Sequence, residues 1–384
     1  MRPDFLQSTR PGRNSRFLAG LICAVVLAAC SPRPGPEILY PRPDAASSPA
    51  IVTLYVVTTR TRAEPVADGF TSGRAAEPSY AEFRISIPPG HVPGEIEWPK
   101  AGIADPAEDF AVVSHTILDR TAFERRVAQQ AGAGGVDGVG VFVHGYNTSF
   151  QEGLFRAAQM SADTSMKGAP VLFSWPSEAK VIGYATDKEA ATYSRDVLTD
   201  LLGSLTAMRE VDRVMLFGHS MGGWLTMETL RQLRLSGQER VLDRLDVVLA
   251  APDIDGDVFR AQLAAIGPLD PPMVVLVSRD DRALGVSSIL QGSRPRIGAL
   301  DVNLPRVQEE ARRANVLMVD ISTIGATDGG LNHSRYAGLA AIYPKLSAQQ
   351  QAGEGGIRGA GAFVLDVVGG TLATPFNVAS DILN

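Results

Sequence analysis

Six short apolar runs in the middle and C-terminal part of the chain constrain its fold more than any other feature. They lie at residues 139–143, 171–174, 214–217, 247–250, 273–277 and 316–319. A run that is apolar throughout, rather than at every second position, indicates a strand buried on both faces, as in a parallel sheet covered by helices. Runs at 51–58, 83–87 and 110–114 predict further strands nearer the N-terminus.

Amphipathic segments fill the gaps between these runs. Apolar residues recur every three or four positions over 150–166, 187–209 and 221–235, and mixed-charge helices are expected over 303–314 and 334–350. A Gly-rich patch at 131–140 is expected to be flexible. The alternation of strands and helices predicts the α/β class, with a doubly wound, mostly parallel sheet and helices on both faces.

Composition excludes several classes of protein. The chain has 384 residues, of which 45% are hydrophobic and 20% charged, so a disordered chain is excluded. The net charge is −6 and no block of like charge occurs, which argues against a nucleic-acid partner. The two cysteines, Cys23 and Cys30, cannot build a zinc cage or a disulfide framework, and no histidine pair stands at ligand spacing. We therefore expect no metal and no cofactor.

The N-terminus has the features of an export signal. Four arginines precede an apolar run of 13 residues, 17–29, which as a helix would reach about 20 Å and is too short to span a bilayer. The last three residues of this run together with the next residue, Leu27 to Cys30, resemble the lipobox of bacterial lipoproteins. That resemblance implies that 1–29 are removed, that Cys30 receives lipid, and that Ser31 favours the outer membrane, facing the periplasm. The alternative is an ordinary signal peptide with an incidental cysteine.

The remaining chain divides by composition. Residues 30–50 contain six prolines and predict an extended tether. Residues 51–350 are assigned to the α/β domain. Residues 351–384 form a Gly-rich tail that is too short and too broken by glycine to span a membrane, and is either packed or loose.

A G-x-S-x-G motif surrounds Ser220, from Gly218 to Gly222. It directly follows the run at 214–217 and directly precedes the helix predicted from Met221. A nucleophile elbow requires this strand–turn–helix context, so Ser220 is the candidate nucleophile. The alternative is a Gly-rich turn with an incidental serine.

A base and an acid must follow the serine in the order serine, acid, histidine. Elimination among the five histidines, His91, His115, His144, His219 and His333, leaves His333 as the base, because it lies in a loop after the last strand. A capping or surface histidine is the alternative.

Two strand ends compete for the acid. Asp281 is preferred because Ser278-x-x-Asp281 matches a turn often seen after the second strand beyond the elbow. Asp280 and then Asp253 remain the alternatives, and the unused carboxylates would be solvated acidic turns.

An oxyanion hole is expected from two backbone amides. One belongs to Met221, directly after the nucleophile, and the other to Tyr146, after the His144-Gly145 pair that ends the strand at 139–143. Asn147 is interpreted as the N-cap of the next helix. Trp175 either shapes an acyl pocket or is a buried plug, and 178–187 is a candidate lid.

Together, the motifs at 142–147, 172–177, 218–223, 250–255, 278–284 and 332–333 resemble one family. It is the bacterial α/β-hydrolases grouped as esterase/lipase-like proteins of unassigned function. The resemblance supports Ser220, Asp281 and His333 as a triad. It implies hydrolysis of a carboxylic ester or a related acyl bond through an acyl-enzyme. The resemblance gives no substrate, and we expect a small-molecule or lipid ester. Acyl transfer by the same triad, or a non-catalytic envelope lipoprotein with this fold, are the alternatives.

Overall fold

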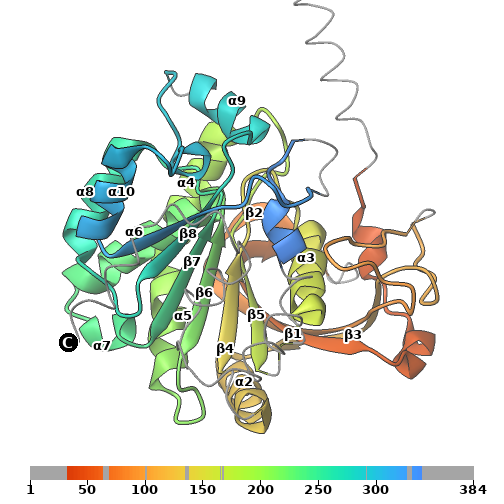
Figure 1. The fold of residues 1–384 in the computed structure, drawn as a ribbon. Coiled ribbons are helices and arrows are strands. Elements are labelled where there is room, and N and C mark those ends of the chain that lie inside the picture. The colour runs from red at the N-terminus through yellow and green to blue at the C-terminus, as the bar shows by residue number, and fades with distance from the viewer. Residues whose placement is uncertain are drawn as a thin grey trace, which may run out of the picture.

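The computed structural model describes residues 33–63, 69–99, 102–134, 138–164, 166, 168–290, 292–326 and 331–339. These residues form a nine-stranded sheet in the order β3-β2-β1-β5-β4-β6-β7-β8-β9 (Figure 1). The strands are β1 (Ile51–Arg62), β2 (Phe70–Ser86), β3 (Ala111–Leu118), β4 (Val139–Val143), β5 (Ala169–Ser174), β6 (Val214–His219), β7 (Leu245–Ala250), β8 (Met273–Val277) and β9 (Val316–Asp320). Each run expected to be a strand lies wholly or largely within one of them.

The sheet is mostly parallel, as predicted. β1 and the strands from β4 to β9 pair in parallel, whereas β2 pairs antiparallel with both β1 and β3. β1 and β2 are joined by a short connection, which suits an antiparallel pair, while the parallel strands are joined through helices.

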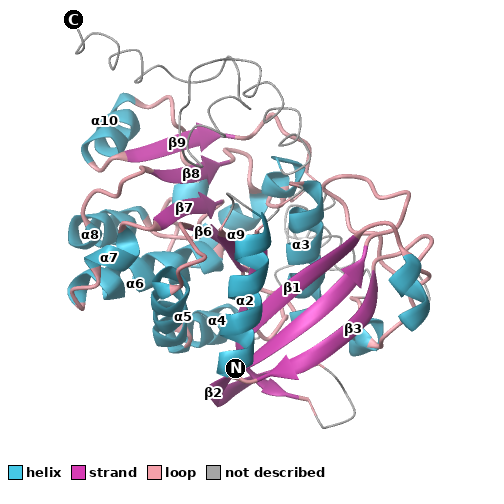
Figure 2. Ribbon diagram, turned by 90° about the horizontal axis from the view of Figure 1, so that it is seen from below, coloured by secondary structure: helices cyan, strands magenta, loops and turns pink. Residues whose placement is uncertain are grey.

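Both faces of the sheet are covered, which explains why the central strands are continuously apolar. In β4, Val141 packs into the core cluster on one face and its neighbour Phe142 into the cluster on the other. The first cluster includes residues of α5, α6 and α8, and the second includes residues of α3 (Figure 2). The helices are α2 (Arg120–Gly134), α3 (Phe150–Asp163), α4 (Tyr184–Tyr193), α5 (Arg195–Ala207), α6 (Met221–Leu235), α7 (Glu239–Leu242), α8 (Gly256–Ile266), α9 (Arg282–Leu290) and α10 (Pro305–Arg313).

Several helices differ from the sequence predictions. The expected helix over 187–209 is two helices, α4 and α5, separated at Ser194, whose hydroxyl donates to the carbonyl of Ala190. The Gly-rich patch expected to be flexible begins with the last turn of α2. The helices α2, α7, α8 and α9 were not predicted from the sequence.

The Pro-rich segment is the clearest correction. Residues 33–50 were expected to be an extended tether, but they form two 3-10 helices, η1 (Pro36–Leu39) and η2 (Pro43–Ser47). Ile38, Leu39 and Ala45 are buried against the sheet. Proline fixes φ near the value of a helical first turn, and three apolar side chains among the prolines suffice to attach the segment.

Other predictions lie outside the described residues. The signal peptide at 1–29, Cys30 and the tail at 351–384 are among them, as is most of the helix predicted over 334–350. Within the described part of the chain, no helix combines the length and the apolar character that a membrane crossing needs.

Candidate active site

The candidate site is built at the carboxyl ends of the central parallel strands. In the sheet register, Val143 at the end of β4 lies beside Gly218 in β6, and His219 lies beside Ala250 at the end of β7. The loops that follow β4, β6, β7 and β8 therefore meet at one edge of the sheet. Parallel α/β sheets place their ligand sites at this edge.

Ser220 occupies a strained turn between β6 and α6. Its backbone has φ 55° and ψ −119°, a conformation that L-residues rarely adopt. Its N–H donates to the carbonyl of Ala250 (2.9 Å), and its carbonyl accepts from the N–H of Asp253 (3.2 Å). The neighbouring strand therefore holds the turn in place. This is the geometry that the motif predicted for a nucleophile elbow.

Two glycines allow the backbones to approach the serine closely. A Cβ added to Gly222 would lie 2.4 Å from the carbonyl oxygens of both Val143 and His144. A Cβ added to Gly145 would lie 3.0 Å from the Cβ of Ser220. The loop after β4, which also contains Tyr146, is therefore packed directly against Ser220.

The structure brings Asp281 and His333 together, although they are 52 residues apart in the chain. The Nδ1 of His333 lies 2.6 Å from the Oδ2 of Asp281, and the Asp281 carboxylate is fully buried. Its Oδ1 accepts the N–H of Leu284 (2.9 Å) in the first turn of α9. This orientation leaves Nε2 as the ring nitrogen of His333 that can exchange a proton with a nucleophile.

The two alternative carboxylates have other partners. Asp280 forms an ion pair with Arg335 (2.7 Å) and accepts from the side-chain amide of Asn332 (2.8 Å). Asp253 is buried and forms an ion pair with Arg296 (3.3 Å). Of the three candidates, Asp281 is therefore the one that contacts His333.

His219 stands beside the candidate base. Its ring centroid lies 4.6 Å from that of His333, and its Nε2 lies 3.4 Å from the His333 carbonyl oxygen. Burial, together with the proximity of His333, holds the pKa of His219 well below its usual range. A neutral His219 adds no charge that would oppose an imidazolium at His333.

Both residues predicted to supply oxyanion amides are close to the serine: Met221 follows it directly in the chain, and Tyr146 follows Gly145, which is packed against Ser220. Met221 is the first residue of α6, where the helix dipole favours negative charge. Tyr146 follows Gly145 in the loop after β4. Asn147 does not cap α3 as expected: the cap is Ser149, whose hydroxyl accepts from the N–H of Glu152 while the Glu152 carboxylate accepts from the Ser149 N–H. Asn147 instead has a positive φ of 57°.

Asp187, which the sequence did not single out, connects the loops around the site. It is fully buried and accepts from the N–H of Asn147 (3.2 Å), the N–H of Glu178 (2.7 Å) and the hydroxyl of Ser177 (2.5 Å). Burial raises the pKa of its carboxyl above the usual value. Asp187 thereby fastens the loop that carries Tyr146 to the loop after β5.

Arg60 is a second residue that sequence reasoning missed. Its buried guanidinium donates to the hydroxyl of Ser174 (2.9 Å) and to the carbonyls of Ser177 (3.1 Å) and Thr148 (2.9 Å). Burial lowers its pKa to about 9. An arginine in a β-rich run gives no local sign of burial, because its partners come from two other loops.

Trp175 is a buried plug, one of the two alternatives considered for it. It has no exposed surface, its ring stacks on that of His144 at 4.8 Å, and its Nε1–H donates to the His144 carbonyl (2.8 Å). Burial lowers the pKa of His144 to about 3, so this imidazole is neutral. In the described residues, no group of three or more His, Cys, Asp or Glu side chains could hold a metal ion.

This elbow on a mostly parallel sheet with helices on both faces defines an α/β-hydrolase. A family model described as "Alpha/beta hydrolase of unknown function (DUF900)" matches residues 119–350. The chain belongs to this family and is a hydrolase, as the sequence predicted.

Two solved structures illustrate how far the likeness extends. The structure of esterase Est22 is 12% identical over 86% of this chain and 90% of its own, with a TM-score of 0.34. A structure of an esterase from the fungus Rhizomucor miehei is 11% identical over 85% of this chain and 97% of its own, with a TM-score of 0.35. No curated protein matches the chain significantly. The family assignment rests on the family model.

Proposed function

We propose that the protein is a serine hydrolase that cleaves a carboxylic ester through Ser220, Asp281 and His333. The observation that carries the proposal is the 2.6 Å contact between His333 Nδ1 and the buried Asp281 carboxylate, at the edge of the sheet where Ser220 occupies the elbow. Asp281 holds the imidazole in the tautomer that presents Nε2 as a base and stabilises the imidazolium that forms.

The reaction proceeds in two acyl transfers. Ser220 Oγ attacks the acyl carbon while His333 Nε2 takes the hydroxyl proton, and this proton then passes to the departing alcohol. Water next attacks the acyl-serine, again giving its proton to His333. The serine recovers that proton as the carboxylic acid leaves.

The negative charge on the carbonyl oxygen is stabilised by the amides of Met221 and Tyr146. Each well-aimed donor is worth about 3–4 kcal/mol to the transition state. Asp187 and Gly145 support this role, since the first fixes the loop that carries Tyr146 and the second lets the loop reach Ser220. The residues present need no cofactor for these steps.

The test is the loss of ester hydrolysis in Ser220→Ala. We expect the wild-type chain to cleave p-nitrophenyl butyrate and to be labelled by a fluorophosphonate probe, and the variant to do neither while keeping its melting temperature. Ser204→Ala in α5 is a matched control, because that hydroxyl donates to the Leu201 carbonyl within its own helix. A Ser220→Ala protein with wild-type activity would refute the proposal.

Two outcomes would point to the alternatives. Acylated alcohol products in the presence of an acceptor alcohol, at the expense of free acid, would identify an acyltransferase that uses the same three residues. Absence of probe labelling in the folded wild-type chain would identify a non-catalytic envelope protein that keeps the fold.

We also propose that Cys30 carries lipid and anchors the protein to the bacterial outer membrane, facing the periplasm. The support is the basic start, the apolar run at 17–29 and the lipobox-like end of that run. Metabolic labelling with radioactive palmitate should mark the wild-type chain and not Cys30→Ser. Labelling that persists in the variant would refute the anchor.

A further inference from the structure

Five large apolar side chains are exposed around the candidate site. They are Val181 (65%), Ile182 (94%), Val286 (55%), Ile289 (72%) and Leu331 (50%), and we call them the apolar rim. A single exposed aliphatic side chain is ordinary on a protein surface, but several gathered at one place mark an interaction surface.

The loop that contains Val181 and Ile182 is joined to α9 beside the nucleophile. Tyr184, which follows this loop, donates its hydroxyl to Asp253 Oδ2 (2.7 Å), and Ser287 of α9 donates to Asp253 Oδ1 (2.7 Å). The N–H of Asp253 in turn donates to the carbonyl of Ser220. The loop and the helix therefore share one anchor next to the elbow.

The remaining rim residues face outward from the same place. Val286 and Ile289 are three residues apart and so lie on one face of α9, while Ser287 between them points inward to Asp253. Leu331 precedes His333 by two residues, and its carbonyl accepts from the N–H that begins α9 (3.0 Å).

The first described residues of the chain are attached at this same place. Arg33, the first described residue, donates from Nη1 to the carbonyl of Ala179 (2.5 Å) and from Nη2 to the carbonyl of Asn147 (2.8 Å). The carbonyl of Pro34 accepts from the side-chain amide of Gln151 (2.7 Å). Arg33 is thus attached to the loop that carries Val181 and to the loop that carries Tyr146.

This position limits where a lipid on Cys30 can lie. Cys30 precedes Arg33 by three residues, and three residues span at most about 11 Å. The tether expected at residues 30–50 is therefore not free to separate the fold from the membrane, because the chain is packed from Arg33 onward.

We propose that the apolar rim lies against the lipid surface that holds the N-terminal anchor. The mouth of the candidate site then opens onto the bilayer, and the substrate class is an ester presented within a lipid surface. This inference rests on the proposed hydrolase function and on the anchor at Cys30. With the lipid on Cys30 as one contact with the membrane and the apolar rim as a second, the protein would have a defined orientation on the bilayer.

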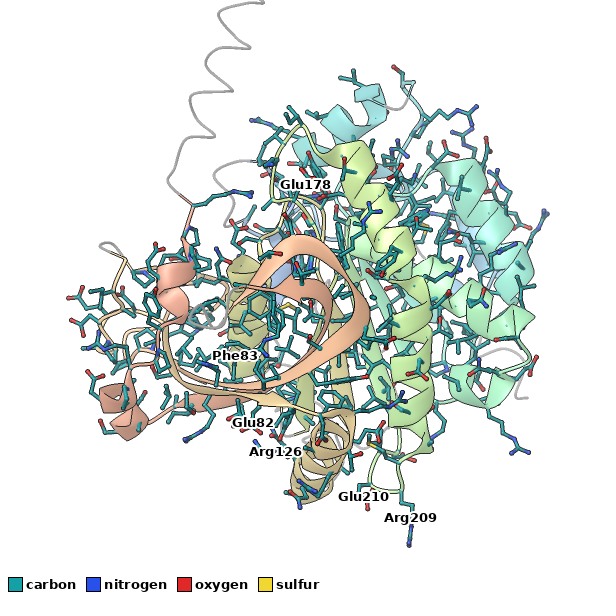
Figure 3. The ribbon with its side chains drawn as sticks, turned by 180° about the vertical axis from the view of Figure 1, so that it is seen from behind. Glu82, Phe83, Arg126, Glu178, Arg209 and Glu210 are labelled. Atoms are coloured by element: carbon teal, nitrogen blue, oxygen red, sulfur yellow. The ribbon has the colours of Figure 1, made fainter. Side chains whose placement is uncertain are left out.

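A fluorescence experiment tests the orientation without any use of catalysis. The full chain is purified from membranes and reconstituted into phosphatidylethanolamine–phosphatidylglycerol vesicles, with an environment-sensitive fluorophore on Ile182→Cys or on Leu235→Cys. Leu235, at the C-terminal end of α6, is 61% exposed and is the matched control. Figure 3 shows Glu178, in the loop that contains Val181 and Ile182, at one end of the strands. Arg209 and Glu210, which precede β6, lie far from it at the other end.

The label at 182 should shift to shorter wavelength in vesicles and be quenched by lipids spin-labelled in their acyl chains. The label at 235 should do neither. Equal behaviour of the two positions would overturn the proposal. A shift at 182 that follows protein concentration in detergent, without vesicles, would also overturn it and assign the rim to a second copy of the chain.

An activity ratio provides the second arm. Ile182→Glu should lower the ratio of hydrolysis of a vesicle-embedded ester to that of a water-soluble ester about tenfold, since a charge at the rim opposes insertion. Leu235→Glu should leave the ratio unchanged. An unchanged ratio in Ile182→Glu would overturn the proposal. If the wild type hydrolysed neither ester, the proposed function would be refuted. The fluorescence experiment would then test the orientation without any activity.

Discussion

The Nδ1 of His333 lies 2.6 Å from the Oδ2 of Asp281, while Asp280, one residue earlier, turns away to Arg335. Two adjacent carboxylates therefore have separate partners. Asp281 is buried, and its second oxygen accepts a backbone N–H, so its position does not depend on His333 alone.

The first prediction separates these two carboxylates. Asp281→Asn should lower kcat for ester hydrolysis by about 10³–10⁴-fold, because the amide no longer fixes the base tautomer of His333. Asp280→Asn should cost less than about tenfold, since it disturbs only the contacts with Arg335 and Asn332. Steady-state kinetics on a soluble ester checks both, and the reverse order of losses would identify Asp280 as the acid.

The second prediction concerns Asp187. Asp187→Asn removes one of the oxygens that accept the N–H groups of Asn147 and Glu178, so it should destabilise the fold by about 1–3 kcal/mol and lower kcat. Urea denaturation and ester kinetics measure the two effects. Glu189→Gln, on the exposed side of the same helix, is the control. If the two variants had the same unfolding free energy and the same kcat, Asp187 would not be needed to hold the loop that contains Tyr146.

The third prediction concerns the contact between the elbow and β4. Gly222→Ala should destabilise the protein by about 3 kcal/mol, because the new methyl group would meet two backbone carbonyls that cannot rotate away. Gly285→Ala, within α9, has open space and should be neutral or stabilising by about 0.5–1 kcal/mol. The melting temperatures of the two variants check this prediction. A wild-type melting temperature in Gly222→Ala would contradict the close approach of the backbones at the elbow.

The fourth prediction concerns pH. His91 contacts the carboxylates of Glu97 (2.8 Å) and Asp163 (2.7 Å). Burial opposes the charged ring, but hydrogen bonds to Asp163 and Glu97 outweigh it and raise the pKa of His91 above 6.5. A raised folded-state pKa contributes stability that is fully present below pH 6.5 and is lost as pH rises through the folded value.

Denaturant unfolding from pH 5 to 9 checks this prediction against the variant His91→Gln. The difference in unfolding free energy between wild type and variant should shrink as pH rises above about 6.5. A difference that is constant across the range would show that His91 does not change its charge in the folded protein.

Local patterns in the sequence were sufficient for the central sheet and the elbow. A fully apolar run predicts a strand buried on both faces, whatever its position in the chain. A G-x-S-x-G motif between a strand and a helix predicts the turn that carries its serine. Ser220 and His333 could be selected in this way, because one depends on local context and the other on the small number of histidines. The packing of residues 33–50 could not be predicted, because three apolar side chains among prolines give no periodic signal.

The fold class and the candidate nucleophile and base could therefore be predicted from local sequence patterns. A turn pattern in the sequence favoured Asp281 over Asp280 and Asp253. The tertiary structure adds that Asp281 is the one of the three that contacts His333, because the partner of each carboxylate comes from a distant part of the chain. Arg60 and Asp187 became visible in the same way. Their burial arises from loops that are distant in sequence, and contacts between distant segments exist only once the sheet has brought the ends of its strands together.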